Sequence, residues 1–116
     1  FTPRELISAM VDCIRPEPNK TIADPACGTG GFFLIAYDYL ASQDLDKEQR
    51  SFLKNNTFYG NEIVANTRRL CLMNLFLHGI GDISAKDSFI SSEDALLSEP
   101  KTRYDYVLAN PPFGKK

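Results

Sequence analysis

Stretches with apolar residues at helical spacing alternate along this chain with short apolar runs of strand length. In the first stretch, apolar residues recur at i, i+4 and related spacings, as on one face of a helix; they are Leu6, Ile7, Met10, Val11 and Ile14. The pattern predicts helices over residues 3–15, 30–42, 46–54 and 64–78, and strands over residues 20–24, 57–61, 82–86 and 103–109. The polar segment 88–101 is expected to form a short helix with loops. This alternation predicts an α/β fold with a doubly wound, parallel sheet.

The composition indicates one globular domain. The chain has 116 residues, of which 43% are hydrophobic, enough for a single core. With a net charge of −2, the chain has no excess of Lys and Arg that would let it bind DNA without partners. No membrane span or signal peptide is recognisable, so we expect a soluble, cytoplasmic protein. Three cysteines without C-x-x-C spacing indicate a reducing compartment, with neither a disulfide framework nor a metal site.

A glycine-rich turn joins the first predicted strand to the second predicted helix. This glycine turn consists of Asp24, Pro25, Ala26, Cys27, Gly28, Thr29, Gly30 and Gly31. Its glycines let the backbone approach a ligand closely, and Asp24 can accept from an ammonium group or an ordered water. The turn begins like the dinucleotide fingerprint, but Phe33 occupies the third glycine position and no P-loop lysine follows. A nucleoside cofactor without phosphates fits better, which favours S-adenosylmethionine.

A second loop, Asn110-Pro111-Pro112-Phe113, directly follows the last predicted strand. Asn110 offers a carbonyl acceptor. The two prolines stiffen the turn and can aim a backbone carbonyl as a second acceptor, while Phe113 offers a stacking face. Two acceptors would raise the lone-pair density of an exocyclic amine. Open α/β sheets bind ligands at the carboxyl ends of strands, so both loops together predict methyl transfer to such an amine, although Asn-Pro alone is also an ordinary turn signal.

Three separated motifs in this order resemble those of adenine-N6 DNA methyltransferases, and more narrowly the modification subunit of type I restriction-modification systems. The motifs are Phe1-Thr2-Pro3-Arg4-Glu5, the glycine turn with Phe32, and Asn110-Pro111-Pro112-Phe113-Gly114. The resemblance spans nearly the whole chain. It implies a Rossmann-like S-adenosylmethionine-dependent methyltransferase fold, with only the N-terminal part of the sheet present. It also implies methylation of the N6 amine of a flipped adenine in DNA, with specificity and restriction subunits as partners.

The same resemblance implies where the ligands would bind. Phe1, Thr2, Pro3 and Arg4, together with the glycine turn, would contact the methionine part of S-adenosylmethionine. Glu62 would bind the ribose hydroxyls. Asp87, Ser88 and Phe89 would lie at the adenine of the cofactor. Asn110, Pro111, Pro112 and Phe113 would hold the target base.

Several of these residues have alternative explanations. Thr2, Pro3 and Glu5 also form a capping box, and Asp87 also fits an ordinary carboxylate at a strand exit. Glu62 also fits an acid stabilised by the dipole of the following helix. His78, the one histidine, is expected to cap a helix rather than to act as a base. The apolar stripe on the helix 64–78 is expected to pack in the core; it consists of Leu70, Leu72, Met73, Leu75, Phe76 and Leu77.

Other functions stay open on the sequence alone. The target could be another planar amine, such as a protein glutamine or a ribosomal RNA base. A catalytically inactive fragment could serve as a cofactor-binding or assembly surface. A nicotinamide-dependent oxidoreductase is disfavoured by the missing third glycine, and cytosine-C5 methylation by the absence of a Pro-Cys pair. Because the chain begins without Met and ends just after Asn110–Phe113, we expect residues 1–116 to be one S-adenosylmethionine-binding domain in a fragment truncated after that loop.

Overall fold

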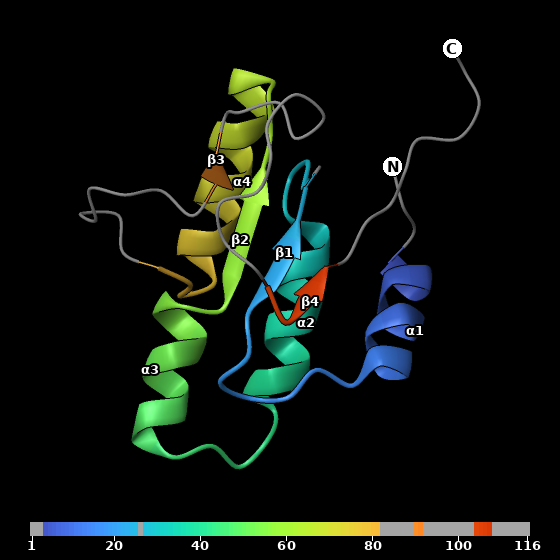
Figure 1. Cartoon of the computed structure of the whole chain (residues 1–116). Helices are drawn as coiled ribbons and strands as arrows, with labels where there is room; N and C mark the ends of the chain where they lie inside the picture. The colour runs from blue at the N-terminus through green and yellow to red at the C-terminus, as the bar shows by residue number, and fades with distance from the viewer. Residues whose placement is uncertain (1–3, 26, 82–89, 92–103, 108–116) are drawn as a thin grey trace.

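The computed structural model describes residues 4–25, 27–81, 90–91 and 104–107. Within these ranges the chain forms a parallel sheet of four strands in the order β3-β2-β1-β4. The strands are β1 (Ile22–Asp24), β2 (Phe58–Asn61), β3 (Ile90–Ser91) and β4 (Tyr106–Val107). The helices are α1 (Arg4–Ile14), α2 (Gly31–Ala41), α3 (Lys47–Asn55) and α4 (Ala65–Leu77). Figure 1 shows α2 and α4 on the same side of the sheet, with α1 beside α2.

The strand order determines which loops meet at one edge of the sheet. Ile22 of β1 lies opposite Phe58 of β2 on one side and opposite Tyr106 of β4 on the other. From β1 the chain therefore builds outward in one direction through β2 and β3, and then returns to add β4 on the other side. Such a reversal is a topological switch point, where doubly wound sheets bind ligands beyond the carboxyl ends of the strands. The predicted fold class is confirmed.

The helices begin and end close to where the sequence predicts. Each of the four lies within one residue of its predicted range at both ends. Local capping explains part of this agreement. In α3, the Asp46 carboxylate accepts from the Gln49 backbone N–H at 2.8 Å, and the Gln49 side chain accepts from the Asp46 backbone N–H at 2.9 Å. Throughout the described ranges, each helix is too short or too polar to cross a lipid bilayer.

One strand differs from the prediction. Strand β3 lies at Ile90–Ser91, inside the segment 88–101 that was expected to form a short helix with loops. The segment 82–86, predicted to be a strand, lies outside the described residues. Ile90 is only 3% exposed and lies opposite Gly60 of β2. Burial of this β-branched side chain against the sheet outweighs the polar character of its neighbours.

The core lies between the sheet and α2. Phe33 of α2 is completely buried, and its ring centroid lies 5.4 Å from that of Phe58 on β2 in a tilted arrangement. Tyr37, one helical turn after Phe33, places its ring centroid 6.5 Å from the same Phe58 ring. Helix α2 is therefore fixed against β2, and the turn that precedes it is held over the carboxyl ends of the strands.

The apolar stripe of α4 is only partly in the core. Leu75 of the stripe and its neighbour on the helix, Cys71, are completely buried. In contrast, Leu70, Met73 and Leu77 are 52%, 57% and 79% exposed. The prediction that the whole stripe packs in the core is wrong for these three residues. Apolar residues lie on more than one face of this helix, and one helix can turn only one face toward a sheet.

The starting ends of β1 and β4 are joined by reciprocal hydrogen bonds. The Asp105 carboxylate accepts from the Thr21 backbone N–H at 2.8 Å and from the Thr21 hydroxyl at 3.2 Å. The same hydroxyl accepts from the Asp105 backbone N–H at 3.0 Å. The Tyr106 N–H then donates to the Thr21 carbonyl at 2.9 Å. Together these bonds fix the register of β4 on β1.

Candidate functional site: the glycine turn and its supports

The glycine turn leaves β1 at Asp24 and enters α2 at Gly31. Gly28 and Gly30 have φ values of 57° and 89°, in a region of backbone conformation that is energetically unfavourable for residues with a Cβ. Gly30 is the N-cap residue of α2, and its N–H donates to the Cys27 carbonyl at 2.9 Å. The Cys27 N–H donates to the Asn61 carbonyl at 3.0 Å, which joins the turn to the end of β2. The turn therefore lies across the carboxyl ends of two neighbouring strands.

Two thiols fill the space behind the glycine turn. Cys27 and Cys71 are buried, with their sulfur atoms 3.9 Å apart. A Cβ added to Gly30 would lie 3.0 Å from the Cys71 sulfur, so α4 packs directly against the turn. The hydrogen bond with Cys71 and burial raise the pKa of the Cys27 thiol far above its ordinary value, so both effects keep this group neutral. Cys27 is only 6% exposed, so its thiol packs behind the turn.

Glu62 connects the glycine turn with the start of α4. Its Oε1 accepts from the Gly28 N–H at 3.1 Å, and its Oε2 accepts from the Val64 N–H at 3.0 Å. The guanidinium of Arg68 donates to the Glu62 carbonyl at 3.0 Å. Glu62 therefore lies as an acid at the N-terminus of α4, as the alternative explanation has it, and it also contacts the glycine turn directly. A carboxylate can accept about four hydrogen bonds, so both oxygens keep capacity for further donors.

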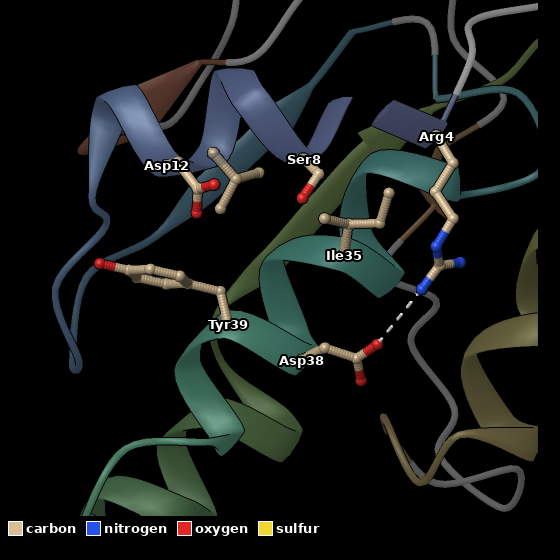
Figure 2. A pocket seen from close by; sticks show the side chains of 7 residues that line it. Arg4, Ser8, Asp12, Ile35, Asp38 and Tyr39 are labelled. Atoms are coloured by element: carbon tan, nitrogen blue, oxygen red, sulfur yellow. Dashed lines mark ion pairs between the residues drawn. The ribbon is translucent and has the colours of Figure 1, made fainter. Parts of the chain in front are cut away.

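Asp24 and Arg4 occupy different surroundings. Asp24 is 3% exposed at the carboxyl end of β1, where it begins the turn. Arg4, the first residue of α1, pairs with Asp38 of α2 at 3.9 Å, with both side chains largely exposed. Figure 2 shows this pair at one end of a cavity of about 250 Å³ between α1 and α2, whose lining includes Ser8 and Tyr39. The Arg4 charge is thus directed toward α2.

The whole chain, residues 1–116, matches the family model described as N-6 DNA Methylase. The methylase subunit of the type I restriction enzyme StySPI of Salmonella potsdam is 39% identical over 121 residues. That of EcoKI of Escherichia coli (strain K12) is 38% identical over the same length. Each match covers 98% of this chain and 23% of the relative. This chain belongs to the N-6 DNA methylase family.

Solved structures of N-6 DNA methylases agree in fold. A crystal structure of the EcoKI M protein superimposes with a TM-score of 0.82 at 37% identity, over 98% of this chain and 25% of that chain. The type I methyltransferase subunit from Streptococcus thermophilus gives a TM-score of 0.69 at 27% identity, over 100% of this chain and 24% of that one. The chain thus spans about a quarter of the length of these relatives. Membership of a methylase family implies a methyl donor.

Many of the predicted site residues of this N-6 DNA methylase chain lie outside the described ranges. They are Phe1, Thr2, Pro3, Ala26, Asp87, Ser88, Phe89, Asn110, Pro111, Pro112 and Phe113. Their roles stay predictions. Among the described site residues, Glu62 is brought into contact with Gly28 of the glycine turn. Arg4 pairs with Asp38 instead. Among the described residues, no group of three or more His, Cys, Asp or Glu side chains is gathered as metal ligands would be.

The structure adds one residue that the sequence interpretation missed. The Nδ2 of Asn74 on α4 donates to the Thr29 carbonyl in the glycine turn at 3.0 Å. The available signal was a single carboxamide within the otherwise apolar run 70–77. His78 is the C-cap residue of the same helix, and its Nδ1 lies 2.8 Å from the Asn74 carbonyl. The prediction that His78 caps the helix is confirmed.

Proposed function

We propose that this chain is the cofactor-binding and base-binding part of an adenine-N6 DNA methyltransferase, the modification subunit of a type I restriction-modification system. The observation that carries the proposal is the hydrogen bond between Glu62 and Gly28, which joins the glycine turn to an acidic side chain directly after the next strand. Residues 1–116 would act as one S-adenosylmethionine-binding domain in the cytoplasm. DNA would be the substrate, and the specificity and restriction subunits the partners. The net charge of −2 is consistent with DNA binding that depends on these partners.

The chemistry of the turn favours S-adenosylmethionine over a nucleotide with phosphates. The Glu62 carboxylate bonds directly to the turn, so a pyrophosphate there would meet a negative charge. The first N–H groups of α2 lack partners within the helix and suit a single carboxylate, such as that of a methionine group. Glu62 can accept from ribose hydroxyls, and Asp24 from an ammonium group. By their motif, Asp87, Ser88 and Phe89 would contact the cofactor's adenine.

In the proposed reaction, positioning supplies most of the catalysis. S-adenosylmethionine supplies an electrophilic methyl group when it is bound. Asn110 would accept one hydrogen of the flipped adenine's N6 amine, and the backbone carbonyl of Pro111 would accept the other. These acceptors would orient the nitrogen lone pair and stabilise the positive charge that develops on nitrogen. Phe113 would stack on the base, and Pro112 would stiffen the loop.

The test combines cofactor binding with DNA methylation in the natural full-length protein. Glu62→Gln replaces an acceptor with an N–H donor facing a backbone N–H, so we expect roughly tenfold or greater loss of affinity for S-adenosylmethionine by calorimetry. The matched control is Glu48→Gln, an exposed acid in the first turn of α3. Asn110→Ala should keep cofactor binding but reduce adenine methylation by about 10²-fold or more. Normal methylation by Asn110→Ala would refute its role, and binding of a nicotinamide dinucleotide instead would refute the assigned cofactor.

A further inference from the structure

The peptide group between Thr29 and Gly30 is fixed at both ends. Its carbonyl oxygen accepts from the Asn74 side chain at 3.0 Å, and its N–H donates to the Cys27 carbonyl at 2.9 Å. The first of these partners belongs to α4, 45 residues further along the chain. The orientation of this peptide in the glycine turn therefore depends on a side chain from another element.

Two residues of α4, one turn apart, contact the glycine turn in different ways. Cys71 lies behind Gly30, where its sulfur would be 3.0 Å from an added Cβ, and so it limits how closely the turn approaches the helix. Asn74 forms a directional hydrogen bond to the neighbouring carbonyl. Packing against Cys71 sets a distance but does not select a peptide orientation. The Asn74 carboxamide can select one.

The turn needs such a contact because its glycines permit rotation. Gly30, at φ 89°, has no Cβ to block the alternative orientation of the preceding peptide. In a flipped peptide, the Thr29 carbonyl oxygen would take the place of the Gly30 N–H and face the Cys27 carbonyl, so the hydrogen bonds to Asn74 and to Cys27 would both be lost. The turn would then change shape next to the first N–H groups of α2, which are the proposed donors to the carboxylate of the cofactor.

We propose that Asn74 is a positioning residue for cofactor binding, and that it acts by holding the Thr29 carbonyl toward α4. The inference rests on the proposed function, since it assigns Asn74 to the S-adenosylmethionine site. Asn74 acts through the turn and has no direct role in methyl transfer. Its loss should therefore weaken cofactor binding more than it slows turnover at saturating cofactor.

The test uses Asn74→Asp and Asn74→Ala in the natural full-length protein. Asn74→Asp is nearly isosteric but presents an acceptor to the Thr29 carbonyl, so we expect the dissociation constant of S-adenosylmethionine to rise at least about tenfold. Asn74→Ala removes the donor without adding repulsion and should raise it roughly twofold to tenfold. In DNA methylation, KM for the cofactor should rise in parallel, while kcat changes by less than about threefold.

Asn55→Asp is the matched control. The Asn55 carboxamide donates to the Ser51 carbonyl at 3.2 Å, the same kind of bond on the exposed surface of α3. We expect this variant to bind S-adenosylmethionine like the wild type. Wild-type affinity in both Asn74 variants would overturn the inference even if their melting temperatures fall, because a purely structural residue gives that result. A wild-type protein that binds no S-adenosylmethionine would overturn the proposed function first, so the two failures are distinguishable.

Discussion

Replacing Gly30 with alanine imposes two separate energetic costs on the glycine turn. The backbone at Gly30 has φ 89°, and placing an L-residue in the left-handed region costs roughly 1–2 kcal/mol. The new Cβ would also lie 3.0 Å from the Cys71 sulfur, and overpacking of a buried site typically costs about 1–3 kcal/mol. Because Cys71 is completely buried, its sulfur has little room to move. Gly30→Ala should therefore destabilise the fold by about 2–5 kcal/mol.

Two further variants separate these costs. Gly79 has a similar φ of 81°, but an added Cβ there would have no atom within 4 Å. Gly79→Ala should therefore show only the backbone cost, roughly 1–2 kcal/mol. Cys71→Ala in the Gly30→Ala background removes the sulfur, so it should restore the part of the unfolding free energy that was lost to the steric clash. A double-mutant cycle measures this recovery as a coupling between positions 30 and 71.

Hydrogen exchange of the β1 and β2 amides gives a common measure for all these variants, since these amides exchange when the sheet opens. The expected change for Gly30→Ala corresponds to exchange roughly 30-fold to several thousand-fold faster than in the wild type. The reasoning is refuted if Gly30→Ala is no less stable than Gly79→Ala. It is also refuted if removing the Cys71 sulfur leaves the difference between them unchanged.

Three other predictions follow from the structure. The hydrogen bonds from Thr21 hold the pKa of Asp105 below its ordinary value of 3.8, so this carboxylate stabilises the fold above pH 3.8 and loses its effect as pH falls through the lowered pKa. Asp105→Asn should therefore reduce the acid sensitivity of unfolding, and an unchanged acid transition would contradict this. Phe33→Ala should destabilise the fold by about 3–5 kcal/mol in chemical denaturation, whereas a loss below about 1 kcal/mol would mean that its ring is not a core residue. Iodoacetamide should alkylate the exposed Cys13 well before Cys27 and Cys71, which are buried, as measured by peptide mass spectrometry; equal rates would argue against their burial.

The sequence predicts local features of this fold well. The capping residues Asp46 and Gln49 and the glycine after α4 act on backbone groups within a few residues, so helix limits follow from short stretches of sequence. Strand β3 depends instead on β2, because Ile90 is held by pairing with Gly60. A strand of two residues has too little sequence of its own to reveal that pairing.

The candidate site likewise contains residues that the sequence reveals and residues that only the fold brings together. The glycine turn is recognisable because its unusual backbone requires glycine over a short segment, and the motif also suggested the role of Glu62. Asn74 and Cys71 were not recognised as supports of the turn, because their contacts exist only once α4 packs against it. The exposure of Leu70 could not be read from the sequence either, since the face that α4 turns toward the sheet is decided by tertiary packing.

The position of β1 in the sheet has a consequence for synthesis on the ribosome. Thr21, beside β1, is bonded to Asp105, which is added to the chain 84 residues later. At translation rates of roughly 5–20 residues per second, this edge of β1 waits about 4–17 s for its partner strand. An unpaired parallel edge is a surface on which nascent chains can associate. Between the synthesis of β1 and that of β4, the nascent chain therefore depends most on chaperones or on slow elongation.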